Sequence, residues 1–134
     1  MDNEFIDKLA FIYLKNGKLL MTLSRGKETY YIPGGKREAG ESDVEALYRE
    51  VKEELQVDLV IPTIKLYGVF EAQAHGKPKG TIVRMTCYTA THRGNFRPGM
   101  EIVKLAYYSY AERSIVGPVD QFIFDDLHAK GFLS

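Results

Sequence analysis

The chain has 134 residues, of which 45% are hydrophobic and 27% are charged, and its 18 basic residues balance its 18 acidic ones. This length predicts one domain, residues 1–134, with enough apolar side chains to bury a core. A formal net charge of zero argues against a dedicated nucleic-acid binder with a broad basic face.

The chain begins with two segments rich in β-forming residues, 5–14 and 18–24. They are joined by Asn16-Gly17, a strong signal for a tight hairpin. A short strand is expected at 30–32. It leads into Pro33-Gly34-Gly35, a loop whose backbone can come close to a ligand because two of its residues lack side chains.

A helix is predicted next. Ser42 followed three residues later by Glu45 forms a capping box, which places the helix from Asp43 to Leu55. Its apolar stripe would be Val44, Leu47, Tyr48, Val51 and Leu55.

The second half alternates apolar segments with turns and ends in a helix. The expected elements are apolar stretches at 57–74 and 81–91, a turn at 75–80, a strand at 102–109, and a helix at 118–130 with Gly131 at its C-cap. Strands before, between and after two helices predict an α/β fold with a mixed sheet flanked by helices.

Three carboxylates of the first helix are crowded together. Glu50, Glu53 and Glu54 point into one sector about 100° wide, because a helix turns by roughly 100° per residue. Like charges at this spacing destabilise a helix unless something positive lies among them. Mg²⁺ is the natural occupant, since it prefers oxygen ligands and is usually shared between carboxylates and phosphate oxygens. Mn²⁺ is the expected substitute.

The same segment carries a resemblance to a known family. Gly35, five residues, Glu41, seven residues and then Arg-Glu-Val-Lys-Glu-Glu-Leu-Gln-Val at 49–57 closely resembles the Nudix box. This box is the signature of hydrolases that act on a nucleoside diphosphate linked to another moiety. The match spans 23 of 134 residues, and every fixed position agrees except Gln56, where the family usually has glycine. The resemblance implies the Nudix fold, an α/β/α sandwich with a mixed β-sheet.

The resemblance also implies roles for single residues. The implied metal ligands are Gly34, through its carbonyl, Glu50, Glu53 and Glu54. The implied catalytic residues are Arg49, which orients a carboxylate, and either Glu50 or Glu53 as general base. Gly35 and Glu41 would support the motif.

Some residues outside the helix have both a functional and a structural interpretation. Glu101 is the candidate for the late-loop glutamate that reaches the metals or acts as base in many relatives; alternatively it is a solvated loop carboxylate. Arg25 and Lys36 are the expected substrate contacts. The basic residues His75, Lys77, Lys79 and Arg84 could clamp phosphates, but an exposed hairpin has the same composition.

Several other positions have structural expectations. Gln56 must either adopt the left-handed conformation of the usual glycine, at a cost of roughly 1 kcal/mol, or the helix must end a residue or two elsewhere. Asp125 and Asp126 are expected to be solvated, and His92 and His128 to lie on the surface. Cys87 is expected to be a small buried hydrophobe.

The predicted function is that of a Mg²⁺-dependent pyrophosphohydrolase for a nucleotide-type small molecule, most simply a nucleoside triphosphate, including oxidised dNTPs. The alternatives are a Nudix-like sensor that binds a nucleotide or sugar phosphate without cleaving it, and an RNA 5′-end decapping enzyme. Neutral net charge weakens the RNA hypothesis. Relatives are often dimers, and the sequence leaves monomer and homodimer open.

The expected location is the cytoplasm. The single cysteine suits a reducing compartment, and the N-terminal residues lack the features of a signal peptide. No apolar run is long enough to span a bilayer, so no membrane association is expected.

Overall fold

A computed structural model describes residues 5–74 and 76–134, so His75 and the first four residues, which carry part of the signal-peptide prediction, lie outside it. The strands are β1 (Phe5–Phe11), β2 (Leu14–Lys15), β3 (Lys18–Ser24), β4 (Gly34–Lys36), β5 (Asp58–Leu59), β6 (Lys65–Gln73), β7 (Ile82–Thr89), β8 (His92–Arg93) and β9 (Ile102–Tyr108). The helices are α1 (Asp43–Leu55), α2 (Pro118–Ala129) and the 3₁₀ turns η1 (Ile61–Thr63) and η2 (Tyr110–Ile115).

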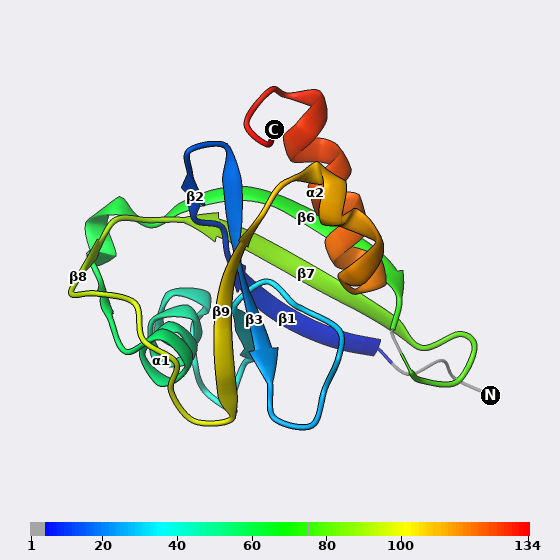
Figure 1. Cartoon of the computed structure of the whole chain (residues 1–134). Coiled ribbons are helices and arrows are strands. Elements are labelled where there is room, and N and C mark those ends of the chain that lie inside the picture. The colour runs from blue at the N-terminus through cyan, green and yellow to red at the C-terminus, as the bar shows by residue number, and fades with distance from the viewer. Residues whose placement is uncertain (1–4, 75) are drawn as a thin grey trace.

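A mixed sheet lies between the two long helices. Its strand order is β4-β1-β7-β6, with β1 parallel to β7 and the other pairs antiparallel. A second sheet, β2-β3-β9, is antiparallel, and β5 pairs with β8. Helices α1 and α2 lie on opposite sides of the main sheet (Figure 1). The predicted α/β/α sandwich with a mixed sheet is therefore confirmed.

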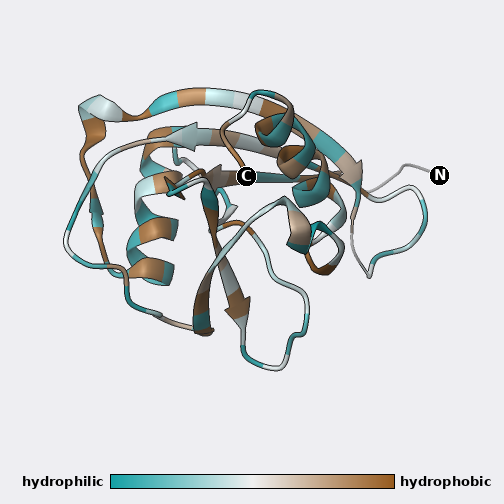
Figure 2. Ribbon diagram, turned by 45° about the horizontal axis from the view of Figure 1, so that its top comes forward, coloured by the Kyte–Doolittle hydropathy of each residue, from teal (hydrophilic) through white to brown (hydrophobic). Residues whose placement is uncertain are grey.

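Two apolar clusters form the core, one under each helix. Helix α1 buries Leu47, Val51 and Leu55 against Leu9 and Phe11 of β1, and all five are almost or fully inaccessible to solvent. Each such side chain contributes about 1.5–3 kcal/mol relative to exposure. Alternate residues of β1 enter the other cluster, under α2. Hydrophobic residues recur along both helices in Figure 2, as a helix packed on a sheet requires.

The predicted caps and the Asn16-Gly17 turn are confirmed, but the first hairpin segment is divided: only Leu14–Lys15 pairs with β3, and β1 pairs in the main sheet. Ser42 Oγ accepts a hydrogen bond from the Glu45 amide at 3.2 Å, and the Glu45 carboxylate accepts one from the Ser42 amide at 2.9 Å. In the hairpin, Lys15 pairs with Lys18, so Asn16 and Gly17 are the two turn residues. Both have positive φ, 53° and 75°, which an Asn-Gly turn of the I′ type needs.

The predicted strand at 30–32 is wrong. Tyr30 and Tyr31 make only isolated bridges, and the strand forms later, at Gly34–Lys36. The amide of Ile32 is taken by the Asp120 carboxylate at 3.1 Å, and Pro33 has no amide hydrogen to donate to a ladder. Glycines that were expected to form a loop are thus paired with β1.

The apolar stretch at 57–74 is divided into three elements. Strand β5 pairs with β8, the 3₁₀ turn η1 follows with a proline in its first turn, and β6 then pairs with β7. Helix α2 ends one residue earlier than predicted, and Gly131 has the expected positive φ of 81°. No helix among residues 5–74 and 76–134 is long and apolar enough to cross a membrane.

Two surface expectations are also wrong. Asp125 binds Arg113 and the Tyr110 hydroxyl, and Asp126 accepts a hydrogen bond from the Tyr67 hydroxyl at 2.6 Å, so neither is simply solvated. The His92 ring is half-buried, 4.2 Å from the centroid of Phe96. The tyrosine partners of Asp125 and Asp126 lie 15 and 59 positions away, so no local pattern could identify those two pairs, whereas Phe96 is only four positions from His92. His128 is on the surface and Cys87 is buried, as expected.

Candidate active site

Two glycines of β4 allow close approaches, one to strand β1 and one to helix α1. A Cβ on Gly34 would lie 1.9 Å from the Leu9 carbonyl oxygen of β1, and its φ of 147° is one that side chains disfavour. A Cβ on Gly35 would lie 2.2 Å from Oε2 of Glu50. The missing side chain of Gly34 therefore lets β4 lie close against β1, and that of Gly35 makes room for the Glu50 carboxylate of α1.

Arg49 gathers the acidic residues on this side of α1. Its Nε and Nη2 bind the two oxygens of Glu41 at 2.7 and 2.9 Å, a paired contact that fixes the guanidinium plane. Its Nη1 donates to Glu50 at 2.7 Å and to Glu53 at 3.1 Å. Nη2 also donates to the Lys36 carbonyl at 3.0 Å, which ties α1 to β4.

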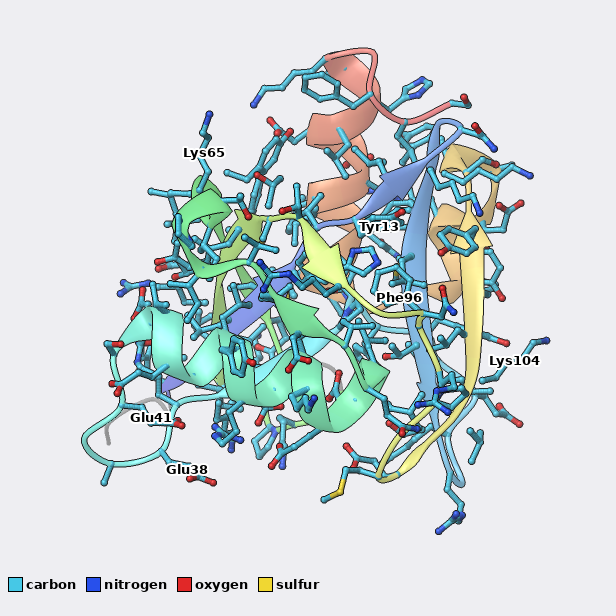
Figure 3. All side chains as sticks on the ribbon, turned by 90° about the vertical axis from the view of Figure 1, so that its left-hand side faces the viewer. Tyr13, Glu38, Glu41, Lys65, Phe96 and Lys104 are labelled. Carbon is cyan, nitrogen blue, oxygen red and sulfur yellow. The ribbon has the colours of Figure 1, made fainter. Side chains whose placement is uncertain are left out.

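The pairing with Glu41 was not expected from the sequence, which placed Arg49 beside Glu53. Figure 3 shows Glu41 at the N-terminal end of α1, on the loop that also carries Glu38. Hydrogen bonds from Arg49 lower the pKa of Glu41 to about 2, so Glu41 stays charged at any ordinary pH. Glu41 thus acts as a permanent anchor for Arg49.

Glu54 is buried at the inner edge of this cluster. Its side chain is only 8% exposed, and Oε1 accepts a hydrogen bond from the Gly34 amide at 3.1 Å. Burial raises the pKa of Glu54 to about 8, and the charges of Glu50 and Glu101 add to this effect. Burial also raises the pKa of Glu50, and contacts with Arg49 offset part of that rise.

The loop before β9 brings Glu101 to the same place. The Glu101 carbonyl accepts a hydrogen bond from the Arg25 amide at 2.8 Å, which fixes the residue against the end of β3. Its side chain lines the same cavity as Glu50 and Glu54, and its charge raises the pKa of both. Glu101 therefore lies beside the carboxylates of α1, and its catalytic role stays a prediction.

This cavity has a volume of about 520 Å³ and two chemically different ends. Glu50, Glu54 and Glu101 line the acidic end beside Gly34 and Gly35. The apolar end is lined by Ile6, Ile32, Ala74, Val83, Met85 and Val119. Such a cavity can take a ligand that joins a charged group to an apolar one.

Basic and aromatic side chains complete the lining. Lys36 lines the cavity as predicted for a substrate contact, and so do Lys8, Lys27 and Lys77. The side chain of Arg25 is not among the cavity-lining residues that the structure describes. Of the other basic residues, Arg84 binds Glu71 at 2.7 Å and is not available to a ligand in that position. Tyr31 also lines the cavity, whereas its neighbour Tyr30 is in the core.

A buried acid behind the cavity was missed in the sequence. Asp120 of α2 is fully buried, and burial raises its pKa to about 7. Its Oδ2 accepts a hydrogen bond from the Ile32 amide, and its Oδ1 accepts no hydrogen bond from any residue that the structure describes. The signal was present, because Asp120 lies three and four positions before the buried Ile123 and Phe124.

Gln56 takes the left-handed conformation, with φ 56° and ψ 37°. The first of the two options for this position therefore holds, and α1 ends where predicted. The Gln56 amide donates to the Lys52 carbonyl at 3.1 Å, as a capping glycine would. Its side-chain Nε2 donates to the Pro98 carbonyl at 2.7 Å, a contact that glycine cannot make.

The carboxylates as they stand are turned toward protein partners. Among the residues that the structure describes, no three acidic, histidine or cysteine side chains are grouped closely enough to hold a metal ion. The reason is visible in the contacts, since Glu50 and Glu53 face Arg49 and Glu54 faces the Gly34 amide. Rotation of Glu50 and Glu53 away from Arg49 would bring hard oxygen donors together.

Comparison with known families decides the family. The sequence profile described as the NUDIX domain matches residues 8–121, most of the chain. The chain belongs to the Nudix family. The predicted resemblance, and with it the expectation of a hydrolase that cleaves diphosphate linkages, is confirmed.

Solved structures of Nudix proteins share the fold. The MutT protein from Methanosarcina mazei Go1 superposes with a TM-score of 0.76 at 16% identity, over 98% of each chain. A Nudix hydrolase from Nitrosomonas europaea gives 0.72 at 24% identity, over 97% of this chain and 90% of its own. The E. coli dihydroneopterin triphosphate pyrophosphohydrolase gives 0.67 at 17% identity, over 92% and 94%.

At these identities the likeness concerns the fold alone. A search of curated proteins found no match to this chain. Family members generally use divalent metal ions and act on nucleotide-like small molecules. The particular metal, the substrate and the role of each residue in this chain are therefore argued below.

Proposed function

We propose that residues 1–134 form one Nudix domain that hydrolyses a diphosphate linkage of a nucleoside triphosphate, oxidised deoxynucleoside triphosphates included, with Mg²⁺. The observation that carries this proposal is the two-ended cavity. Three carboxylates and an apolar wall open on a single space of about 520 Å³. A nucleotide has the matching chemistry, because its phosphates need a cation and its base needs an apolar surface.

The acidic end suits a hard divalent cation. Its side-chain donors are carboxylate oxygens. The pKa values of two of these carboxyl groups, Glu50 and Glu54, are raised by burial and by neighbouring negative charges. A cation among them would relieve that repulsion. We assign Mg²⁺, with Mn²⁺ as substitute, to Glu50, Glu53 and Glu54, with the Gly34 carbonyl as a further ligand. When bound, the cation neutralises charge on the diphosphate and lowers the pKa of a bound water.

The side chains around it would position the water and take its proton. Glu50, Glu53 or Glu101 is the general base, because Glu50 and Glu101 line the cavity and Glu53 shares Arg49 Nη1 with Glu50. Arg49 orients Glu50 and Glu53, and Glu41 holds Arg49 in place. As the water oxygen attacks phosphorus, the bond from that phosphorus to the bridging oxygen breaks and the leaving phosphate takes the electron pair. A triphosphate would give a nucleoside monophosphate and pyrophosphate.

Basic residues at the cavity would bind the outer phosphates. Lys36 lines it, and Lys27 and Lys77 approach it from other loops. Arg25 would have to swing toward the cavity to reach the same groups, since it is anchored there only through its backbone amide. Tyr31 and the apolar wall are the surfaces available to the base.

A substrate panel with Mg²⁺ tests the proposal. The compounds are dNTPs, oxidised dGTP, ADP-ribose, dinucleoside polyphosphates, nucleotide sugars and capped or triphosphorylated RNA, each scored by the identity of its products. We expect pyrophosphate release from a nucleoside triphosphate that is abolished by EDTA and restored by Mg²⁺ or Mn²⁺. Glu71→Gln is the charge-matched control for Glu→Gln variants of the acidic cluster. It removes an exposed acid that is paired with Arg84 on the main sheet.

The other outcomes of this panel separate the rival functions. Tight nucleotide binding without product in Mg²⁺ would indicate a sensor. Activity confined to RNA ends would indicate a decapping enzyme. Light scattering on the same preparation separates monomer from homodimer. We also propose a cytoplasmic location, because the single cysteine, Cys87, suits a reducing compartment.

A further inference from the structure

The C-terminal end of α1 is bound to the loop that carries Glu101. The last carbonyls of the helix lack partners within the helix and must be satisfied from outside. The Leu55 carbonyl accepts a hydrogen bond from the Arg97 amide at 3.0 Å, and the Glu54 carbonyl accepts one from the Gly99 amide at 3.0 Å. Residues 97–99 therefore run directly against the end of the helix.

The contact is too close for any side chain at Gly99. A Cβ there would lie 2.2 Å from the Glu53 carbonyl oxygen and 3.1 Å from Cγ of Gln56. Between the two donating amides, Pro98 has no amide hydrogen of its own and cannot make a third backbone tether of this kind. Its carbonyl is instead held by Gln56 Nε2 at 2.7 Å, a side-chain bond between residues 42 positions apart.

Glu101 lies two residues after Gly99. Met100 turns the backbone with a φ of 52°, and the Gly99 carbonyl accepts the Ile102 amide at 3.0 Å, so the turn is short and closed. Glu101 is therefore held from two sides, by this turn and by the Arg25 amide that donates to its carbonyl, and loss of the Pro98 contact would release the first of them. The carboxylate of Glu101 in turn faces the cavity beside Glu50 and Glu54.

We propose that Gln56 is a positioning residue, which holds residues 97–101 against α1 so that Glu101 faces the acidic end of the cavity. This inference rests on the proposed hydrolase function. It explains why this chain can replace the usual glycine of the box. Gln56 bears the left-handed conformation and in exchange supplies a hydrogen bond that glycine lacks. Gln56 is not among the cavity-lining residues that the structure describes, and its side-chain amide donates to the Pro98 carbonyl.

Two variants separate the side-chain bond from the backbone conformation. Gln56→Met keeps the length of the side chain and the left-handed strain but cannot donate to Pro98. Gln56→Gly relieves the strain and also removes the bond, so it is expected to fold at least as readily as Gln56→Met. Each is made in the native chain and in Glu101→Gln.

The first readout does not depend on activity. Hydrogen exchange of the Arg97 and Gly99 amides should be at least tenfold faster in Gln56→Met than in the native protein, because the middle tether of the loop is lost. Exchange of the amides in the middle of α1 should be unchanged. Equal exchange at Arg97 and Gly99 in the two proteins would overturn the proposal.

The second readout is kinetic, with whichever nucleotide the substrate panel identifies. We expect Gln56→Met and Gln56→Gly to lower kcat about tenfold, with KM within about twofold, because displacement of a catalytic group by an ångström costs rate rather than binding. In the Glu101→Gln background the same changes should have no further effect on kcat. An unchanged kcat, or an equal loss in both backgrounds, would overturn it.

The hydrolase function and the positioning role of Gln56 can be refuted separately. If the native protein cleaves nothing in the panel, the hydrolase function fails, and the exchange measurement still tests whether Gln56 holds the loop. If the native protein is active and Gln56→Met matches it, only the positioning role fails.

Discussion

Glu54→Gln should change how the stability of the metal-free protein depends on pH. Glu54 is buried, and its pKa rises from 4.5 to about 8 in the folded state. The unfolded chain therefore releases this proton above about pH 4.5, while the folded protein keeps it until about pH 8. Its contribution to stability is fully present below pH 4.5 and is lost as the pH rises through 8.

The structure sets the size of this effect. At about 1.4 kcal/mol per pKa unit, the rise from 4.5 to about 8 corresponds to roughly 5 kcal/mol. This is an upper limit, because water in the open cavity screens part of the charge. Glutamine keeps the acceptor for the Gly34 amide and has no proton to lose, so it should remove this component alone.

The assay is urea unfolding followed by circular dichroism between pH 5 and 8.5 in EDTA. The native protein should lose up to about 4 kcal/mol more than Glu54→Gln across this range, because part of the full effect is already lost at pH 5. Asp120 titrates with the same sign, since its pKa is raised from 3.8 to about 7, but it is present in both proteins and cancels in the difference. Parallel stability curves for the two proteins would refute the reasoning.

Cation binding gives a second check on the same group. A divalent cation beside Glu54 favours its charged form, so Mg²⁺ binding at pH 7 should release up to about one proton. Calorimetry in two buffers with different ionisation enthalpies measures that number. Glu54→Gln should release close to none from this position.

Three further substitutions test the arrangement around the carboxylates. Glu53→Gln should leave the circular dichroism spectrum intact and lower kcat by orders of magnitude; turnover like that of the native protein would remove Glu53 from the mechanism. Gly35→Ala places a Cβ 2.2 Å from Oε2 of Glu50, so that flexible side chain must move, and kcat should fall about tenfold or more while urea stability changes little. Arg49→Lys loses the paired contact with Glu41, so kcat should fall about 10–100-fold. The pKa of Glu41, measured by NMR, should rise from about 2 toward 4.5. An unchanged Glu41 pKa would contradict the assigned network.

The sequence determined the elements whose signals are local. The capping box fixed the start of α1 at Asp43, and the Asn16-Gly17 turn fixed the hairpin, because both depend on contacts between near neighbours. Helical spacing placed Glu50, Glu53 and Glu54 together for the same reason. The family and the α/β/α arrangement were implied by the resemblance of residues 35–57 to the Nudix box and were confirmed.

The tertiary structure decided what depends on residues far apart in the chain. It gave the Ile32 amide to Asp120, 88 positions away, and so moved the strand from 30–32 to Gly34–Lys36. It brought Glu101 to the acidic end of the cavity and joined Gln56 to Pro98. Local propensity cannot specify these contacts, because their partners meet only when the sheet, α1 and α2 have packed together.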